Sequence, residues 1–390
     1  MKINKVGIYL ESGPACGGSY QYNRFLLQAL ADICQDKIEL VTFLAADHWQ
    51  EAVASYQLKQ IKTPVSNFWQ KLAGVWRRSK TPLAVWHWFA KRYHPLARKL
   101  IQEQCDVVIF PSQDALTYLM PVPTIGVIHD LMHRYERQFP EVGNKKEYLK
   151  REFHYQKLCE WSTGILVDSE LGREQAEESY VAAKNKCHAL PFITSVEAVQ
   201  SIDLKDKYNL PEKYFFYPAQ FWQHKNHIRL LNALDNAVQS YPDMKLVLVG
   251  SPKNGYDEVV ETISNLNLQK SVSILGLVPD EDMAGLYQSA RALIMPTFFG
   301  PTNIPPLEAF ALNCPVAVSN IYAMPEQYQD AALYFDPNST EEIQHALTRL
   351  WSEDALCEDL IKKGRGIHEN WHYPQFRNQL ESILISMEIH

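Results

Sequence analysis

The chain has 390 residues, 46% of them apolar and 21% charged, which is the composition of a globular protein long enough for two domains. Its net charge of -7 argues against a general nucleic-acid binder, and its seven cysteines, without a C-x-x-C pair, argue against a disulfide framework. No uncharged apolar run approaches the roughly 18 residues of a membrane span, and residues 1–8 lack a signal-peptide core, so we expect a cytoplasmic protein.

Two glycines mark the first candidate site. Residues 6–10 form a short apolar run typical of a buried strand, and residues 19–30 have apolar positions at helical spacing. Gly17 and Gly18 lie between them and would let the backbone approach a phosphate or a sugar closely. The alternatives are tight strand–helix packing, or a dinucleotide fold, whose G-x-G-x-x-G spacing is absent although Glu39 follows about twenty residues on.

After a second strand at 38–44, the stretch 52–102 carries ten Lys or Arg residues and no acid. It also contains Trp69, Trp76, Trp86 and Trp88. Basic residues mixed with tryptophans at roughly helical spacing predict interfacial helices that face anionic lipid headgroups. The alternatives are a helical subdomain with buried tryptophans and solvated lysines, and a nucleic-acid groove.

Further strands are predicted at 106–110, 124–128, 164–168 and 187–192. The strand at 124–128 delivers His129 and Asp130 to its carboxyl end, where open α/β sheets place ligands. A histidine there can donate to a phosphate or a sugar hydroxyl, and Asp130 could orient it. The alternative is that the pair merely caps a turn.

The second half repeats the alternation of strands and helices after a polar linker at about 194–211. This alternation predicts a second parallel sheet, and a final helix covers 371–387. The strands are expected at 214–218, 245–250, 272–276, 290–296 and 315–319.

The most informative stretch is 300–310, between the last two of these strands. Pro305 and Pro306 can open a helix that would run to about residue 312, with Asn313 as its cap. Free backbone N–H groups and the helix dipole make such a start an anion site. Glu308, one turn in, could accept hydrogen bonds from sugar hydroxyls. The alternative is an ordinary loop with a solvated glutamate.

With these strands around it, the stretch resembles the family 4 glycosyltransferases of the GT-B fold, over nearly the whole chain and most strongly at 214–336. The family signature, E-x7-E, is commonly written E-G-F-G-L-P-P-L-E. Residues 304–308 match its end, so Glu308 takes the second glutamate, which the resemblance implies binds the donor ribose. The first glutamate falls on Gly300, so its role at the donor sugar is absent or is met by another group such as Asn303.

The resemblance implies two further groups. The family's Arg and Lys on the donor diphosphate fall on Gln220 and Lys225, so only one of the two cations is kept. The site residues implied in this way are catalytic His129, Lys225 and Glu308; donor-binding Gln220, Lys225, Thr302, Asn303, Ile304 and Glu308; and an acceptor and phosphate loop of Gly17, Gly18, His129 and Asp130.

Residues 280–282 read as the D-x-D metal motif of the other glycosyltransferase fold. They precede a helical pattern, so we expect Asp280 to cap that helix and expect no metal site.

The resemblance implies an α/β protein with two Rossmann-like domains facing each other across a cleft: an acceptor domain at 1–195, with the helix 370–390 packing back on it, and a donor domain at 196–369. It implies a retaining, metal-independent hexosyltransferase without a cofactor. The donor would be a GDP- or UDP-sugar carrying a mannose-, rhamnose- or glucose-like hexose, and the acceptor a lipid-linked or cell-surface glycan, reached at the inner face of an anionic membrane through residues 52–102. The alternatives are a sugar-nucleotide hydrolase or epimerase, a non-catalytic sugar-nucleotide or glycan binder, and an NAD-dependent oxidoreductase, for which the fingerprint is missing.

Overall fold

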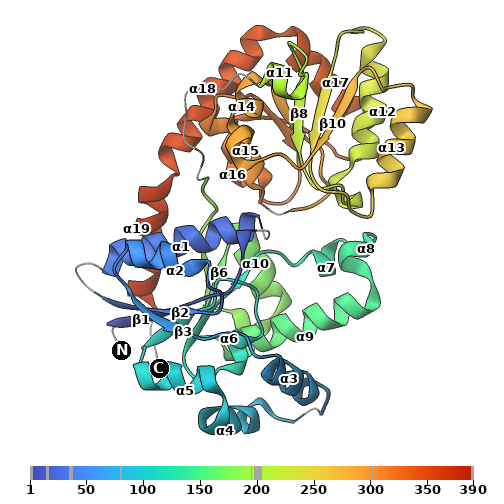
Figure 1. Cartoon of the computed structure of the whole chain (residues 1–390). Coiled ribbons are helices and arrows are strands. Elements are labelled where there is room, and N and C mark those ends of the chain that lie inside the picture. Colours follow the sequence, from blue (N-terminus) through green and yellow to red (C-terminus); the bar gives the residue numbers. More distant parts are fainter. Residues whose placement is uncertain are drawn as a thin grey trace. The chain divides into compact units, whose positions relative to one another are not determined.

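The computed structural model describes residues 3–14, 17–34, 38–79, 81–194, 196, 204–300 and 302–387. The chain divides into two units, each built on one parallel sheet between helices (Figure 1). Unit 1 consists of Met1–Leu131, Tyr148–Pro191 and Tyr373–His390, and unit 2 of Met132–Glu147 and Phe192–His372.

The sheet of unit 1 has seven parallel strands in the order β3-β2-β1-β4-β5-β6-β7. Because the chain fills positions on one side of β1 and then returns to the other side, the topological switch point lies between β1 and β4, where open α/β sheets bind ligands. The strands are β1 (Lys5–Leu10), β2 (Glu39–Leu44), β3 (Lys59–Lys62), β4 (Val107–Ile109), β5 (Thr124–Ile128), β6 (Gly164–Val167) and β7 (Cys187–Ala189).

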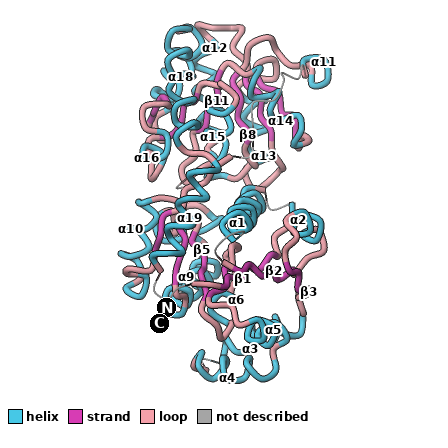
Figure 2. The backbone as a smooth tube through the Cα atoms, turned by 90° about the vertical axis from the view of Figure 1, so that its left-hand side faces the viewer, coloured by secondary structure: helices cyan, strands magenta, loops and turns pink. Residues whose placement is uncertain are grey.

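Helices cover both faces of this sheet. On one side α1 (Gly18–Cys34) packs against α19 (Tyr373–Ser386), with Phe376 edge-on to Tyr22 (Figures 1 and 2). On the other side lie α3 (Asn67–Ser79), α4 (Leu83–Tyr93), α5 (Pro95–Glu103) and α6 (Leu116–Leu119). The remaining helices of this unit include α2 (Trp49–Ser55), α9 (Lys145–Trp161) and α10 (Glu170–Ser179).

The stretch 52–102 differs in two ways from the interfacial helices predicted for it. It contains β3, an edge strand whose flanking lysines discourage pairing with another chain and also mask the apolar alternation by which strands are recognised. Its tryptophans are also divided between environments. Trp76 and Trp86 are buried in the core, as the helical-subdomain alternative requires, whereas Trp88 is 69% exposed.

The sheet of unit 2 has six parallel strands in the order β10-β9-β8-β11-β12-β13. They are β8 (Phe215–Pro218), β9 (Leu246–Val249), β10 (Val272–Gly276), β11 (Ala292–Met295), β12 (Val316–Ser319) and β13 (Ala332–Phe335). One helical layer contains α12 (His227–Val238), α13 (Tyr256–Asn265) and α17 (Thr340–Ser352), and the other α14 (Asp280–Ser289), α15 (Ile304–Ala311) and α18 (Asp354–Asn370) (Figure 1). Every predicted strand is present in the two sheets, and β3 and β13 were not predicted.

A segment from the first half of the chain belongs to unit 2. Residues Met132–Glu147 form the short helices α7 (Met132–Tyr135) and α8 (Pro140–Gly143). Met132 and Val142 are buried against Phe299 in a small apolar cluster. These residues fall within the range 1–195 expected for the acceptor domain, and no helix was predicted in them because helices this short show no periodic pattern.

Two expectations concern the linker and the membrane. Within the predicted linker at 194–211, residues 195 and 197–203 lie outside the described residues, and Lys205–Tyr208 form the short helix α11. Among the helices of the described residues, none combines the length and apolar character needed to cross a bilayer.

Candidate functional site

The predicted strand–turn–helix unit is present: β11 ends at Met295, α15 starts at Ile304, and β12 follows. Gly300, in the turn, has φ +115, a conformation that L side chains rarely adopt. A Cβ atom there would come within 2.8 Å of Asn303 Oδ1, while Asn303 Nδ2 donates to the Gly300 carbonyl at 2.8 Å. The asparagine side chain therefore packs against the position of the family's first glutamate, and a side chain at residue 300 would require this turn to change. Residue 301 lies outside the described residues.

The start of α15 is a weaker anion site than expected. Asn303 occupies the N-cap position, and its backbone N–H lies 3.2 Å from the hydroxyl of Tyr328. The next positions after Ile304 are Pro305 and Pro306, which have no N–H, so two of the four donors that a helix start normally exposes are missing. The helix dipole is retained, but a charged side chain has to supply most of the attraction for an anion.

Lys225 is placed to supply that charge. Its Nζ lies 3.4 Å from Asn303 Oδ1, although the two residues are 78 positions apart. Burial lowers the pKa of Lys225 to about 8. The ammonium is therefore poorly solvated in the free protein, and an anion next to it would stabilise its charged form.

The loop that carries Lys225 is fixed from both sides. Tyr217 donates its hydroxyl to the Lys225 carbonyl at 2.9 Å. The next residue, Asn226, is buried in a left-handed conformation and donates through Nδ2 to the carbonyls of Pro296 and Pro337, both at 2.9 Å. These bonds join the ends of three segments at the carboxyl edge of the second sheet.

Glu308 lies one turn into α15, as predicted, and Tyr287 from α14 donates its hydroxyl to Glu308 Oε2 at 2.7 Å. Burial raises the pKa of Glu308 to about 7, and the hydrogen bond from Tyr287 opposes this effect. The carboxyl group therefore titrates near neutral pH. Tyr287 and Tyr328 are supporting residues that the sequence analysis did not assign, since buried tyrosines carry no distinguishing spacing.

The remaining donor residues differ in how firmly they are held. Gln220 is exposed, and its amide oxygen accepts a hydrogen bond from Trp222 Nε1 at 2.9 Å. Thr302 is buried beside Asn303. The structure thus brings Lys225, Asn303 and the start of α15 together and leaves Gln220 on an exposed loop.

Glu141, from the segment Met132–Glu147, is within hydrogen-bond distance of the loop that carries Lys225, at His224. Its Oε1 lies 3.2 Å from His224 Nδ1 and 3.3 Å from the His224 backbone N–H. The imidazole stacks on Phe299 with ring centroids 3.9 Å apart, and the His224 carbonyl accepts from the N–H of Phe298 at 2.8 Å. Burial raises the pKa of Glu141, but the hydrogen bonds from His224 outweigh it and hold the pKa at about 2.

His129 and Asp130 follow β5 in unit 1, as predicted. Burial lowers the pKa of His129 to about 4, partly opposed by the charge of Asp130, so the imidazole is neutral near pH 7 and can donate from one ring nitrogen without carrying charge. Arg151 Nη2 lies 2.6 Å from Asp130 Oδ1, so the carboxylate forms an ion pair with this arginine. Arg151 also reaches Tyr155 Oη at 3.1 Å, and Tyr155 donates to Gln113 at 2.9 Å.

The two glycines lie where a helix begins. Gly17 has φ +56 and donates its N–H to the Pro14 carbonyl at 3.1 Å, and Gly18 is the first residue of α1. The positive φ accounts for glycine at position 17. Residues 15 and 16 lie outside the described residues.

The residues of the D-x-D sequence have structural contacts. Helix α14 begins at Asp280 itself with Pro279 at the cap position, so the predicted cap is displaced by one residue. Asp282 is buried and accepts from Lys207 at 2.6 Å and from Tyr208. Within the described ranges, no three His, Cys, Asp or Glu side chains are grouped closely enough to hold a metal ion.

Comparison with known proteins places these features in context. A family model described as Glycosyl transferases group 1 matches residues 200–367. The O-antigen chain mannosyltransferase RfbU of Salmonella typhimurium is 25% identical over 342 residues, covering 87% of this chain and 88% of that protein. The serotype-specific mannosyltransferase WbdA of Escherichia coli is 25% identical over 261 residues, covering 62% of this chain and 31% of the relative. The chain thus matches less than a third of the length of the first curated relatives.

Among solved structures, HepE from Anabaena in complex with UDP superposes with a TM-score of 0.71 at 13% identity, covering 98% of this chain and 99% of that chain. At this identity the likeness shows the fold alone. The expected architecture of two Rossmann-like parallel sheets is confirmed.

Proposed function

We propose that this chain, which belongs to the glycosyl transferases group 1 family, moves a hexose from a nucleotide-sugar to a glycan acceptor with retention of anomeric configuration. The observation that supports this most directly is the approach of Lys225 Nζ to Asn303 at the start of α15. One cation, one helix N-terminus and one carboxylate lie within a single unit, which is the arrangement that a nucleoside diphosphate requires.

The chemistry follows from where charge develops. In the proposed reaction, the bond between the anomeric carbon and the diphosphate oxygen breaks while a bond to the acceptor oxygen forms on the same face. The acceptor proton passes to the leaving diphosphate. Lys225 and the dipole of α15 stabilise the growing negative charge, and this electrostatic contribution is commonly the largest in such reactions.

Glu308 and His129 have separate roles in this proposal. Glu308 accepts hydrogen bonds from the ribose hydroxyls, most strongly when it is ionised, because both of its oxygens are then charged acceptors. His129, which is neutral near pH 7, donates to the sugar or to the acceptor and acts by positioning it. Gly17 and Gly18 allow the backbone to approach the diphosphate or the acceptor.

The substrate class is proposed from the relatives. RfbU and WbdA are named as mannosyltransferases of O-antigen chains, and HepE was crystallised with UDP. We therefore propose a mannose-like hexose, a GDP- or UDP-sugar as donor, and a lipid-linked or surface polysaccharide as acceptor.

Association with an anionic membrane is a further part of the proposal. Helices α3 and α4 expose large apolar side chains, with Phe68 65% and Trp88 69% exposed, among the basic residues of the stretch 52–102. Such a surface matches an interfacial site for anionic lipid. Flotation with vesicles of phosphatidylglycerol and phosphatidylcholine tests this association. We expect the protein to float with the vesicles, and binding to fall with added salt and with Trp88→Ala. Recovery of all the protein in the bottom fraction of the gradient would refute it.

The central experiment measures nucleotide binding and then turnover. A thermal-shift panel of GDP, UDP, dTDP and ADP should identify one stabilising nucleotide. With the corresponding sugar nucleotide and a glycan acceptor, Lys225→Met and Glu308→Gln should lower transfer by orders of magnitude, while exposed Lys270→Met should not. Normal transfer by Lys225→Met would remove the assignment, and donor consumption without acceptor would instead indicate a hydrolase.

A further inference from the structure

A cavity of about 650 Å³ lies entirely within unit 1 and is not used by any step described above. Its floor is formed by residues that follow β1 and β4, the two strands that flank the topological switch point of the sheet. Its wall is formed by the segment between β3 and α3, by α3 itself and by the start of α5. The volume is in the range of small-molecule sites, about 300–1,000 Å³, and the position is where α/β sheets bind ligands.

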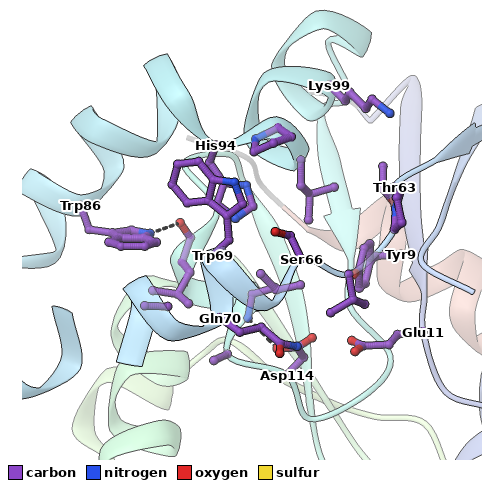
Figure 3. A pocket seen from close by; sticks show the side chains of 18 of the residues that line it. Tyr9, Glu11, Thr63, Ser66, Trp69, Gln70, Trp86, His94, Lys99 and Asp114 are labelled. Atoms are coloured by element: carbon purple, nitrogen blue, oxygen red, sulfur yellow. Dashed lines mark hydrogen bonds between the residues drawn. The ribbon is translucent and has the colours of Figure 1, made fainter. Parts of the chain in front are cut away.

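The floor of this cavity carries a pair of acids. Glu11 follows β1 and Asp114 follows β4, and Figure 3 shows their carboxyl groups approaching each other at the bottom of the cavity. Burial, together with the neighbouring Asp114 carboxyl group, raises the pKa of Glu11 to about 8, so near pH 7 Glu11 keeps its proton and can donate it to Asp114. Asp114 Oδ1 also accepts from the N–H of Leu116 at 2.9 Å, which fixes the carboxylate. The pair presents both a donor and acceptors to the cavity.

The wall opposite is aromatic. Trp69 is partly buried, with its ring 4.7 Å from the imidazole of His94 and tilted by 51° to it. Trp86 donates its indole N–H to the Leu119 carbonyl at 3.1 Å, so this donor is already used and the ring offers only apolar surface (Figure 3). A supported aromatic face across from carboxyl groups suits a pyranose ring, which has an apolar C–H face and hydroxyls at its edge.

The acid pair is connected to the residues placed at the acceptor above. Gln113, next to Asp114, accepts from Tyr155, which in turn bonds to Arg151, the partner of Asp130. The loop that carries Asp114 and the end of β5 that carries His129 are therefore fixed by one hydrogen-bond network. Such a network rigidifies the groups that it joins.

An alkyl chain is the competing occupant, since much of the wall is apolar. It would leave the Glu11–Asp114 pair facing hydrocarbon without water, which is costly for polar groups and more so for a carboxylate. A saccharide satisfies the same groups. The chemistry of the floor therefore decides between the two occupants.

We propose that this cavity is a saccharide subsite that binds a sugar ring of the acceptor between Trp69 and the Glu11–Asp114 pair. The proposal rests on the proposed transferase function, because it identifies the ligand as acceptor. The resemblance implies an acceptor domain at 1–195 but gives no role to Trp69, Glu11 or Asp114, so the proposal adds this cavity and these side chains as the place of one acceptor ring.

The test measures saccharide binding without any nucleotide, so its failure is distinct from failure of the donor assignment. Saturation-transfer NMR is run on the full chain with the methyl α-glycosides of mannose, rhamnose, glucose and galactose. At least one should bind, and Trp69→Ala should weaken it by roughly tenfold or more, as should Glu11→Ala. Trp69→Phe should retain part of the affinity, and Trp161→Ala, at an exposed tryptophan of unit 1 that does not line the cavity, should bind as the unaltered chain does.

Two controls make the result decisive. The nucleotide-induced thermal shift, which reports unit 2, and circular dichroism confirm that each variant is folded. Decanol is tested as the alkyl probe in parallel. Absence of binding by all four glycosides, binding that Trp69→Ala and Glu11→Ala leave unchanged, or binding of decanol in place of the glycosides would each overturn the proposal.

Discussion

The affinity for the sugar-nucleotide donor should follow a bell-shaped pH profile, because one binding group must be protonated, another binds best when deprotonated, and their pKa values lie close together. Lys225 has to carry its proton to attract the diphosphate, and burial lowers its pKa to about 8. Glu308 accepts most strongly from the ribose hydroxyls after it loses its proton, and burial raises its pKa to about 7. Affinity should therefore fall as the pH rises through about 8 and also as it drops through about 7.

The size of each effect follows from the protonation equilibrium. If the wrong protonation state does not bind, the dissociation constant is multiplied by 1 + 10^ΔpH, where ΔpH is the distance beyond the pKa. One unit beyond each pKa the affinity is about 11-fold weaker, near 1.4 kcal/mol, so the loss should be similar at pH 9 and pH 6. The diphosphate of a sugar nucleotide is a diester and stays ionised over this range, so it does not contribute to the change.

Isothermal titration calorimetry of the sugar nucleotide from pH 6 to pH 9 measures this profile. Lys225→Met should weaken binding by about 1.5–3 kcal/mol at pH 7.5 and abolish the alkaline limb only. Glu308→Gln should abolish the acid limb only. The matched controls are Lys270→Met and Glu281→Gln, both exposed in unit 2, which should keep the full bell. A flat profile for the unaltered chain, or an alkaline limb that survives Lys225→Met, would refute the reasoning.

Three further predictions concern residues that hold the structure of each unit. Glu141→Ala removes the acceptor of both His224 hydrogen bonds, so kcat/KM in steady-state assays should fall by about tenfold or more. Glu141→Gln keeps an oxygen acceptor and should restore most of kcat/KM, and equal losses in both variants would contradict a positioning role. Gly300→Ala should destabilise unit 2 by about 1–3 kcal/mol in urea denaturation, because φ is +115 and the added Cβ would meet Asn303, and an unchanged midpoint would show that the turn adapts freely. The pKa of Glu11 is raised in the folded chain, so its contribution to stability should be complete below its ordinary pKa of 4.5 and lost as the pH rises through about 8. Thermal melts of Glu11→Gln should lack this pH-dependent contribution. Identical pH profiles of the melting temperature in the variant and the unaltered chain would argue against the shared proton.

The elements that the sequence predicted correctly are those with a strong local signal. The unit β11–α15–β12 is bounded by apolar runs and opened by Pro305 and Pro306, so its type and order follow from local rules. By contrast, β3 has lysines at both ends of Lys59–Lys62, and β13 is a four-residue run after a turn. Neither shows an alternation long enough to be recognised without its neighbours in the sheet.

The residues of the candidate site could be proposed from the sequence, but their geometry could not. Lys225 and Asn303 are 78 positions apart, and only the resemblance suggested that they act on one group. The pairing of Glu141 with His224 had no signal, because it depends on a segment from the first half of the chain folding with unit 2. The same holds for Glu11 and Asp114, which become neighbours only through the order of the strands.

Asn226 makes the loop that carries Lys225 sensitive to deamidation. Its side-chain amide is the common donor to two main-chain oxygens, those of Pro296 and Pro337. Deamidation would replace that donor by a carboxylate of nearly the same shape. Its oxygens would then repel the carbonyl oxygens of Pro296 and Pro337, at the point where these hydrogen bonds now join three chain segments. The replacement of one amide group would thereby loosen the carboxyl edge of the sheet, from which Lys225 projects.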